Sequence, residues 1–190
     1  NQISFTIEGR PADSEHSPVA ELAAVSPGHF RVLEIPILSG RNFTDSDDDK
    51  ALPVAIVDQT LARQYWPNEN PIGKRVKSGP IQSTNPWLNI IGVVGDVKTD
   101  SLELQEAPHI YLSDFQAPSY NSVIYLRTAG DPGTLGDAIR PAVEAVDPNV
   151  PVYAVRTMED VIARSMAERR FALQIPVSYT HLRAHETGRN

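Results

Sequence analysis

The sequence predicts an α+β fold with two lobes, in which a middle lobe is inserted into a split βαβ unit. Two observations support this prediction. Near both ends of the chain, segments that alternate like strands are neighbours of segments with helical periodicity. The middle third instead holds short apolar segments separated by Pro and Gly. The expected order is strand, helix, strand, then a mixed middle, then strand, helix, strand, helix.

The composition is that of a globular protein. With 190 residues, 41% hydrophobic and 22% charged, the chain can form one domain or two small lobes. Cysteine is absent, which excludes disulfides, thiolate metal sites and cysteine nucleophiles. The net charge of −7 argues against a nucleic-acid partner, because binding phosphates requires clustered Lys and Arg. No apolar run reaches the length of about 18 residues that spans a bilayer.

The first third begins with strands. Residues 3–7 alternate apolar and polar side chains, which predicts a half-buried strand, and residues 19–25 can form a second one. Ser26 as an N-cap and Pro27 at the first helical position predict a short helix, with Phe30 on its apolar face. This helix should end before Pro36, because the residue before a proline is disfavoured in helices.

The middle third is predicted as a series of short elements. Residues 45–50 are strongly acidic and are expected to form a solvated loop. A buried strand over 54–57 should lead into a helix over 58–66 that Pro67 closes. Three more strands are expected over residues 73–76, 89–95 and 109–112.

The last third is predicted to alternate strands and helices. A strand over 122–127 precedes a helix that starts at Asp131-Pro132, and Pro141 should kink that helix or interrupt its hydrogen bonds. A strand over 152–155 follows. Thr157 is then expected to cap a last helix, with Asp160 at the capping-box position.

The acidic segment resembles a calcium-binding loop only in part. Read as an EF-hand from Asp45, it has carboxylates at positions 1, 3 and 5. The sixth position requires Gly but holds Lys50, and the twelfth requires Glu but holds Ile56. We therefore predict no metal site here.

Other candidate chemistry is equally weak. Gly92 and Gly95 follow an apolar segment but do not open a helix, so they do not form a dinucleotide fingerprint. The histidines form neither a zinc-binding H-E-x-x-H motif nor a triad pattern; they are His16, His29, His109, His181 and His185. Trp66 and Trp87 are expected to be core or interface anchors. The sequence predicts no catalytic, cofactor-binding or metal-ligating residues, and therefore no enzyme.

Four segments, taken in order and with their spacing, resemble the MacB-like periplasmic core domain of ABC transporter permeases, in the MacB/FtsX family. The first comprises residues 25–30 with 35–36 and 40–43, the second runs from 54–57 through 62–67 to 71–75, the third is 91–97, and the fourth is 155–160 with 169–171. Together they are spread over almost the whole chain from residue 3 to residue 175.

The resemblance implies a domain over residues 1–175. A porter-like lobe would comprise about 1–44 and 119–175, and the inserted lobe about 45–118. It also implies transmembrane helices shortly before Asn1 and just after Phe171. These helices would tether the domain on the extracytoplasmic, periplasmic side of the bacterial inner membrane. Residues 176–190 continue none of the patterns above and resemble vector-derived read-through.

The function implied by the resemblance is coupling of cytoplasmic ATP hydrolysis to export or to mechanical transmission across the envelope. The implied partners are the chain's own transmembrane helices, a second permease copy, a cytoplasmic ATPase that acts indirectly, and a periplasmic adaptor. The alternative is a stand-alone extracytoplasmic ligand-binding or adaptor module. Such a module would require a concave apolar pocket with a few convergent polar groups.

Overall fold

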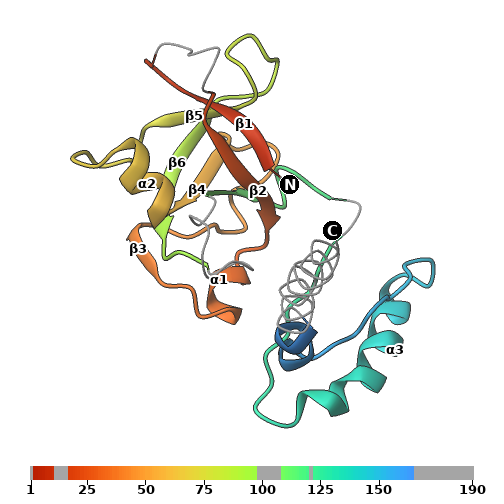
Figure 1. The fold of residues 1–190 in the computed structure, drawn as a ribbon. Coiled ribbons are helices and arrows are strands. Elements are labelled where there is room, and N and C mark those ends of the chain that lie inside the picture. Colours follow the sequence, from red (N-terminus) through yellow and green to blue (C-terminus); the bar gives the residue numbers. More distant parts are fainter. Residues whose placement is uncertain (1, 11–16, 98–107, 120–121, 165–190) are drawn as a thin grey trace, which may run out of the picture. The chain divides into compact units, whose positions relative to one another are not determined.

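The computed structural model describes residues 2–10, 17–97, 108–119 and 122–164 (Figure 1). The chain divides into two compact units, Asn1–Leu126 and Arg127–Asn190, and each is described by itself.

The first unit consists mainly of strands. Its elements are, in order, β1 (Gln2–Ile7), β2 (Val19–Val25), α1 (His29–Val32), β3 (Ile37–Gly40), β4 (Val54–Asp58), α2 (Gln59–Tyr65), β5 (Arg75–Ser78), β6 (Leu88–Val94) and β7 (His109–Ser113). The strands predicted over 3–7, 19–25, 54–57, 73–76, 89–95 and 109–112 are therefore confirmed to within a few residues, as is the helix over 58–66.

The seven strands form one mixed sheet in the order β3-β6-β4-β7-β2-β1-β5, and β5 also pairs with β6. This last pairing closes the sheet on itself through β6, β4, β7, β2, β1 and β5. The pairs β2–β7 and β4–β6 are parallel, and the others are antiparallel. Closure of this kind leaves no free edge among those six strands, so a ligand can enter only from an end.

Two apolar clusters pack on the two faces of the sheet. One contains Phe5 and Ile7 of β1 with Ala55 and Val57 of β4, together with Leu61 from α2. The other contains Val54 and Ile56 of β4 with side chains from α1 and the loop after β3. Because alternate residues of β4 enter opposite clusters, this strand is buried on both faces, as its continuous apolar sequence predicts.

The start of α1 differs from the prediction. The predicted cap Ser26 accepts a hydrogen bond from the backbone N–H of His29 through its carbonyl, and Gly28 is the N-cap. Pro27 therefore lies in the turn before the helix and not at its first position. The helix ends before Pro36, as expected.

Strand β3 was not predicted from the sequence. All four of its residues are exposed, so no alternation marks them. It forms because its backbone pairs with β6 beside Gly92. Gly40 closes the strand with φ +74, and a β-carbon there would collide with the carbonyl oxygen of Ile91.

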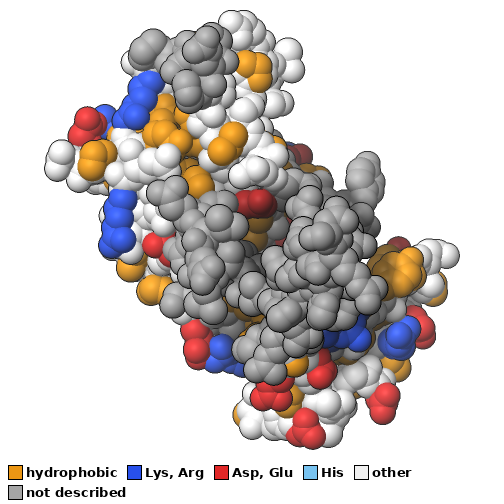
Figure 2. Space-filling model, viewed as in Figure 1, with side chains coloured by type: hydrophobic (Ala, Val, Ile, Leu, Met, Phe, Trp, Pro, Cys, Tyr) orange, Lys and Arg blue, Asp and Glu red, His pale blue; other side chains and the backbone are white. Residues whose placement is uncertain are grey.

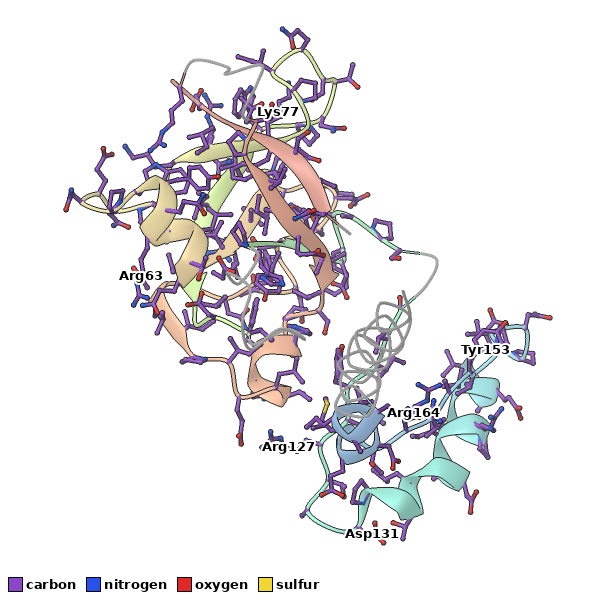
Figure 3. All side chains as sticks on the ribbon, in the orientation of Figure 1. Arg63, Lys77, Arg127, Asp131, Tyr153 and Arg164 are labelled. Carbon is purple, nitrogen blue, oxygen red and sulfur yellow. The ribbon has the colours of Figure 1, made fainter. Side chains whose placement is uncertain are left out.

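The second unit is described over residues 127–164. The 3₁₀-helix η1 (Pro132–Leu135) leads directly into α3 (Gly136–Val146), and residues 158–164 are helical. Asp131 lies at the start of η1 and Tyr153 in the segment after α3 (Figure 3). The predicted start at Asp131 is confirmed, since its carboxylate accepts a hydrogen bond from the Gly133 N–H. Pro141 lies inside α3, which continues past it.

The capping box of the last helix is also confirmed. The backbone N–H of Asp160 donates to Thr157 Oγ1 at 3.1 Å, and the Asp160 carboxylate accepts from the backbone N–H of Thr157 at 3.4 Å. This is the reciprocal pattern of a capping box, with Asp in place of Glu.

The strands predicted over 122–127 and 152–155 are wrong, since neither segment pairs with another described strand. A single strand leaves its backbone groups without ladder partners, so an alternating pattern alone does not form a strand. Their apolar side chains are largely exposed, for example Val123 at 75% and Tyr153 at 79%. Apolar side chains are visible beside charged ones on the described surface (Figure 2).

The division into a porter-like lobe and an inserted lobe stays a prediction, and the strands of the first unit are shared between the two predicted lobes. Strands β1, β2 and β3, from the predicted porter-like lobe, share the sheet with β4 to β7, from the predicted inserted lobe. The boundary between the two units lies after Leu126. The predicted tail, 176–190, lies outside the described residues. No helix among the described residues is long and apolar enough to cross a membrane.

Candidate functional site

The first unit contains a cleft of about 410 Å³. It lies where β4 and β6 begin and where β5 and β7 end, so it opens at one end of the closed sheet. Strand β4 leads from this end to Asp58, where α2 starts. The opposite end is therefore the one that α2 covers.

The cleft is lined mainly by apolar side chains. Leu22 of β2, Leu112 of β7 and Leu88 of β6 also contact the cluster on the inner face of the sheet. Loop residues complete the lining, and the full set is Leu22, Asp49, Ala51, Pro53, Val54, Ser78, Asn85, Pro86, Leu88, Leu112, Gln116 and Ala117. An apolar hollow with a few polar groups is the usual form of a ligand site.

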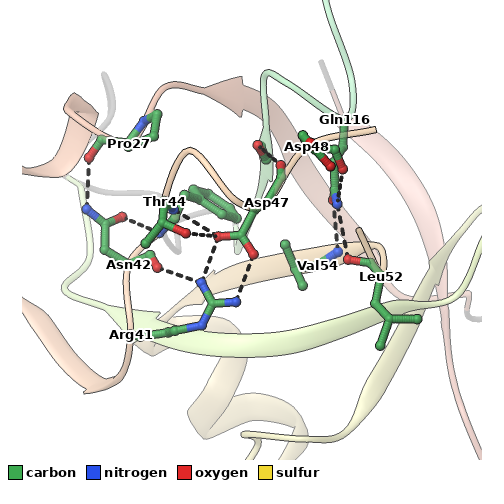
Figure 4. Close-up of polar contacts among 11 residues, drawn as sticks. Pro27, Arg41, Asn42, Thr44, Asp47, Asp48, Leu52, Val54 and Gln116 are labelled. Atoms are coloured by element: carbon green, nitrogen blue, oxygen red, sulfur yellow. Dashed lines mark hydrogen bonds and ion pairs between the residues drawn. The ribbon is translucent and has the colours of Figure 1, made fainter. Parts of the chain in front are cut away.

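Gln116 holds one wall of the cleft in place. Its Nε2 donates to the carbonyl oxygens of Asp48 at 2.9 Å and Leu52 at 3.1 Å, and its Oε1 accepts from the backbone N–H of Val54 at 3.0 Å. One amide therefore ties the acidic loop to the first residue of β4 (Figure 4). Because both ends of this amide are occupied, Gln116 shapes the cleft and leaves ligand contacts to other residues.

The sequence predicts a solvated acidic loop, but this loop is only partly solvated, because Asp47 is 4% exposed. Arg41 donates to both of its carboxylate oxygens, at 2.7 and 2.8 Å, and the backbone N–H and hydroxyl of Thr44 also donate to it (Figure 4). The bond from Arg41 is the main reason that the pKa of Asp47 lies below its usual value. Ser113 Oγ donates to the Asp47 carbonyl and joins the loop to β7.

A second buried carboxylate lies at the opposite end of the sheet. Asp58 Oδ1 accepts from the backbone N–H of Leu61 at 2.8 Å and so caps α2. Its Oδ2 accepts from the backbone N–H of His109 at 2.8 Å and lies 3.1 Å from His109 Nδ1. Asp96 Oδ1 accepts from the Thr60 N–H at 2.7 Å. These bonds join β4, β6, β7 and α2, so the cluster is structural in character.

The residues weighed for chemistry are widely separated. His29 packs against the rings of Phe30, Tyr111 and Tyr125, and its burial lowers its pKa. His109 pairs with Asp58, whereas His16, His181 and His185 lie outside the described residues. The described residues include no group of three or more His, Cys, Asp or Glu side chains that could hold a metal.

The glycine and the two tryptophans considered in the sequence pack against other parts of the protein. Gly92 lies inside β6, where a β-carbon would collide with the carbonyl oxygen of Arg41. Trp66 is buried in the inner cluster, as expected. Trp87 packs under the cations of Arg75 and Lys77, which lie 5.9 and 5.4 Å from its ring centre. Lys77 is among the residues labelled in Figure 3. The cleft itself was missed by sequence reasoning, because its lining comes from loops and strands distant in the chain.

Comparison with known proteins identifies relatives. The model of the MacB-like periplasmic core domain family matches residues 2–146. The ABC transporter permease YknZ of Bacillus subtilis (strain 168) is 25% identical over 159 residues, which are 78% of this chain and 38% of that protein. The macrolide export ATP-binding/permease protein MacB of Aggregatibacter actinomycetemcomitans is 32% identical over 77 residues, 40% of this chain and 11% of that protein. The chain thus spans well under half the length of these relatives.

Solved structures show the same fold at low identity. The periplasmic region of MacB from Actinobacillus actinomycetemcomitans superposes with a TM-score of 0.54 and 16% identity, covering 77% of this chain and 63% of that chain. A domain of a Porphyromonas gingivalis protein described as a permease gives a TM-score of 0.51 at 14% identity, covering 85% and 77%.

Proposed function

The chain belongs to the MacB-like periplasmic core domain family, and we propose that it couples cytoplasmic ATP hydrolysis to export or to mechanical transmission across the envelope, as part of an ABC transporter permease. The observation that carries the proposal is the match of the family model to residues 2–146. The fold shared with the periplasmic region of a MacB protein supports it.

The construction of the two units is consistent with this role. The first unit has a closed sheet whose strands are joined by backbone ladders and by the buried Asp47 and Asp58 bonds. Such a body moves as a whole, because breaking its ladder would leave buried polar groups unpaired. The second unit holds short helices with exposed apolar side chains. A rigid body joined to a second unit can transmit displacement along the chain.

The implied surroundings belong to the same proposal. The domain would lie on the extracytoplasmic side of the inner membrane, between transmembrane helices of its own, beside a second permease copy. An ATPase would act on it from the cytoplasm, and a periplasmic adaptor is a further partner. In this proposal the second unit belongs to the porter-like lobe, and the sheet of the first unit includes the inserted lobe.

A second candidate function is ligand binding, which the cleft favours. The cleft combines an apolar lining with a small number of polar groups. This function can coexist with coupling, since the cleft lies within the first unit and requires no movement of the second.

Labelling of a single cysteine tests the proposed location. Leu52 is 77% exposed, and this chain has no cysteine of its own. In cells that express a cysteine-free parent permease carrying Leu52→Cys, a membrane-impermeant maleimide should label this cysteine while the inner membrane is still intact. A cysteine on the ATPase subunit should react only after lysis of the inner membrane. Protection of Leu52→Cys until lysis would place the domain on the other side and refute the proposal.

A further inference from the structure

The cleft at the open end of the sheet has an accessible mouth and a closed base. Strands β4 and β6 begin at this end, and β5 and β7 finish there. The interior beyond it is filled by the apolar cluster that includes Leu61 and Trp66 near α2. An occupant can therefore insert an apolar part among Leu22, Leu88 and Leu112, while its other end faces the surrounding loops.

Some polar groups of the cleft are already hydrogen-bonded within the protein, and others are not. Gln116 has both ends of its amide engaged, and Asn85 Nδ2 donates to the Ser78 carbonyl at 2.9 Å. Asn85 Oδ1, the Ser78 hydroxyl and the Asp49 carboxylate have no hydrogen bond to another residue within the described part of the chain. These free groups can all accept hydrogen bonds, and the hydroxyl can also donate one. An occupant that donates hydrogen bonds is therefore favoured.

The charged residues at the mouth of the cleft also favour an occupant that is a hydrogen-bond donor, namely a cation. Asp49 is the one charged residue among those that line the cleft. Asp45 and Asp48 on the same loop are also acidic, whereas Lys50, which follows Asp49, is a cation that does not line the cleft. The nearby cation of Arg41 is already paired with Asp47. Lys77 Nζ donates to the Ile81 carbonyl at 3.2 Å and packs over Trp87. An anionic occupant would meet the Asp49 carboxylate in the lining of the cleft and be repelled, whereas a cation would be attracted to it.

We propose that this cleft binds a small cationic amphiphile, with its apolar body among Leu22, Leu88 and Leu112 and its ammonium group at Asp49. The volume of about 410 Å³ limits the apolar body to a small one, such as a phenylalkyl group. This ligand site is a function in addition to coupling, and its binding can be measured on the chain without the rest of the permease.

A matched set of three probes tests the proposal on the 190-residue chain. The probes are 4-phenylbutylamine, 4-phenylbutan-1-ol and 4-phenylbutyrate, which share an apolar body and differ in charge. In an NMR titration at neutral pH, the amine should shift the backbone amide signals of Leu22, Leu88 and Leu112. The alcohol should bind several-fold more weakly, because it lacks the ion pair, and the carboxylate should bind most weakly.

Two variants separate a built site from a general attraction of cations to an acidic protein. Asp49→Asn should weaken the amine about fivefold, to the affinity of the alcohol, since an exposed ion pair contributes up to about 1 kcal/mol. Asp45→Asn makes the same charge change on the same loop but does not line the cleft, so it should leave the amine's affinity unchanged. Both residues are exposed, and both variants should fold.

Three results would overturn the proposal. One is the absence of shifts at the cleft with the amine, and another is an equal effect of the two variants. A third is equal binding of all three probes that Asp49→Asn does not change, which would indicate an apolar site without charge selection. None of these results bears on the coupling role, which is measured in the parent permease.

Discussion

The bond between Arg41 and Asp47 joins a half-exposed cation to a buried carboxylate in the first unit. The same carboxylate binds Thr44, and the Asp47 backbone accepts from Ser113. The pair therefore fixes the loop that forms one side of the cleft, in a segment whose sequence suggests only solvated charge.

Removing the cation should destabilise the first unit. We expect Arg41→Met to lower the free energy of unfolding by about 1–3 kcal/mol, because Asp47 would stay buried without its partner. Urea unfolding followed by circular dichroism measures this. Lys74→Met breaks the Lys74–Glu69 pair, in which both side chains are exposed, and should leave the urea midpoint unchanged. Equal effects of the two substitutions would show that Asp47 needs no counter-charge.

The same bond predicts a pH dependence. Arg41 lowers the pKa of Asp47 in the folded protein, so the folded state binds a proton less readily than the unfolded chain. This contribution to stability is present above the unfolded pKa of about 4 and is lost as the pH falls through the folded pKa. The stability difference between the natural chain and Asp47→Asn should therefore shrink below pH 4. A difference that is constant from pH 7 to pH 3 would contradict this.

Among the elements, β3 shows how close backbone approach replaces side-chain packing. Its residues are exposed, and its place beside β6 depends on glycine at Gly40 and Gly92. At both positions a β-carbon would collide with a carbonyl oxygen of the neighbouring segment. The strand is thus specified by small residues and by pairing, with little contribution from hydrophobic burial.

A pair of glycine substitutions separates collision from backbone strain. Gly40 and Gly73 both have positive φ, +74 and +84, but a β-carbon at Gly73 meets nothing within 4 Å. Gly73→Ala should cost about 1 kcal/mol, the usual penalty for this backbone region. Gly40→Ala should cost clearly more, because strand β3 must also move from β6. Equal losses in urea unfolding would mean that β3 does not approach β6 as described.

The sequence predicts those elements whose signal is local. The alternation of residues 3–7 and the apolar run over 54–57 are sufficient for β1 and β4, and Asp58 marks the start of α2. The exposed β3 has no such signal. The alternation over 122–127 is present, but without a paired neighbour it forms no strand among the described residues.

The site depends on contacts between distant residues, which local patterns do not reveal. Closure of the sheet rests on the pairing of β5 with β6 and of β5 with β1. Gln116 lies 62 residues from the Val54 amide that it binds. Neither partner carries a motif, so the cleft follows only from the assembled fold. The absence of a catalytic site stays a prediction from the sequence.

For the molecule as a whole, the proposed coupling function predicts that the distance between the two units changes as ATP is hydrolysed. Leu52 in the first unit and Val146 in the second are 77% and 89% exposed, and no cysteine of this chain competes for label. Spin labels at these positions report the distance between the units. Labels at Leu52 and Ile81, both in the first unit, provide the control.

The most direct test is double electron–electron resonance on the doubly labelled parent permease, reconstituted with its ATPase, without nucleotide and trapped with ATP. We expect the Leu52–Val146 distance distribution to change between the two states, while the Leu52–Ile81 distribution stays the same. An unchanged Leu52–Val146 distribution, in a preparation that hydrolyses ATP and transports its substrate, would contradict the account.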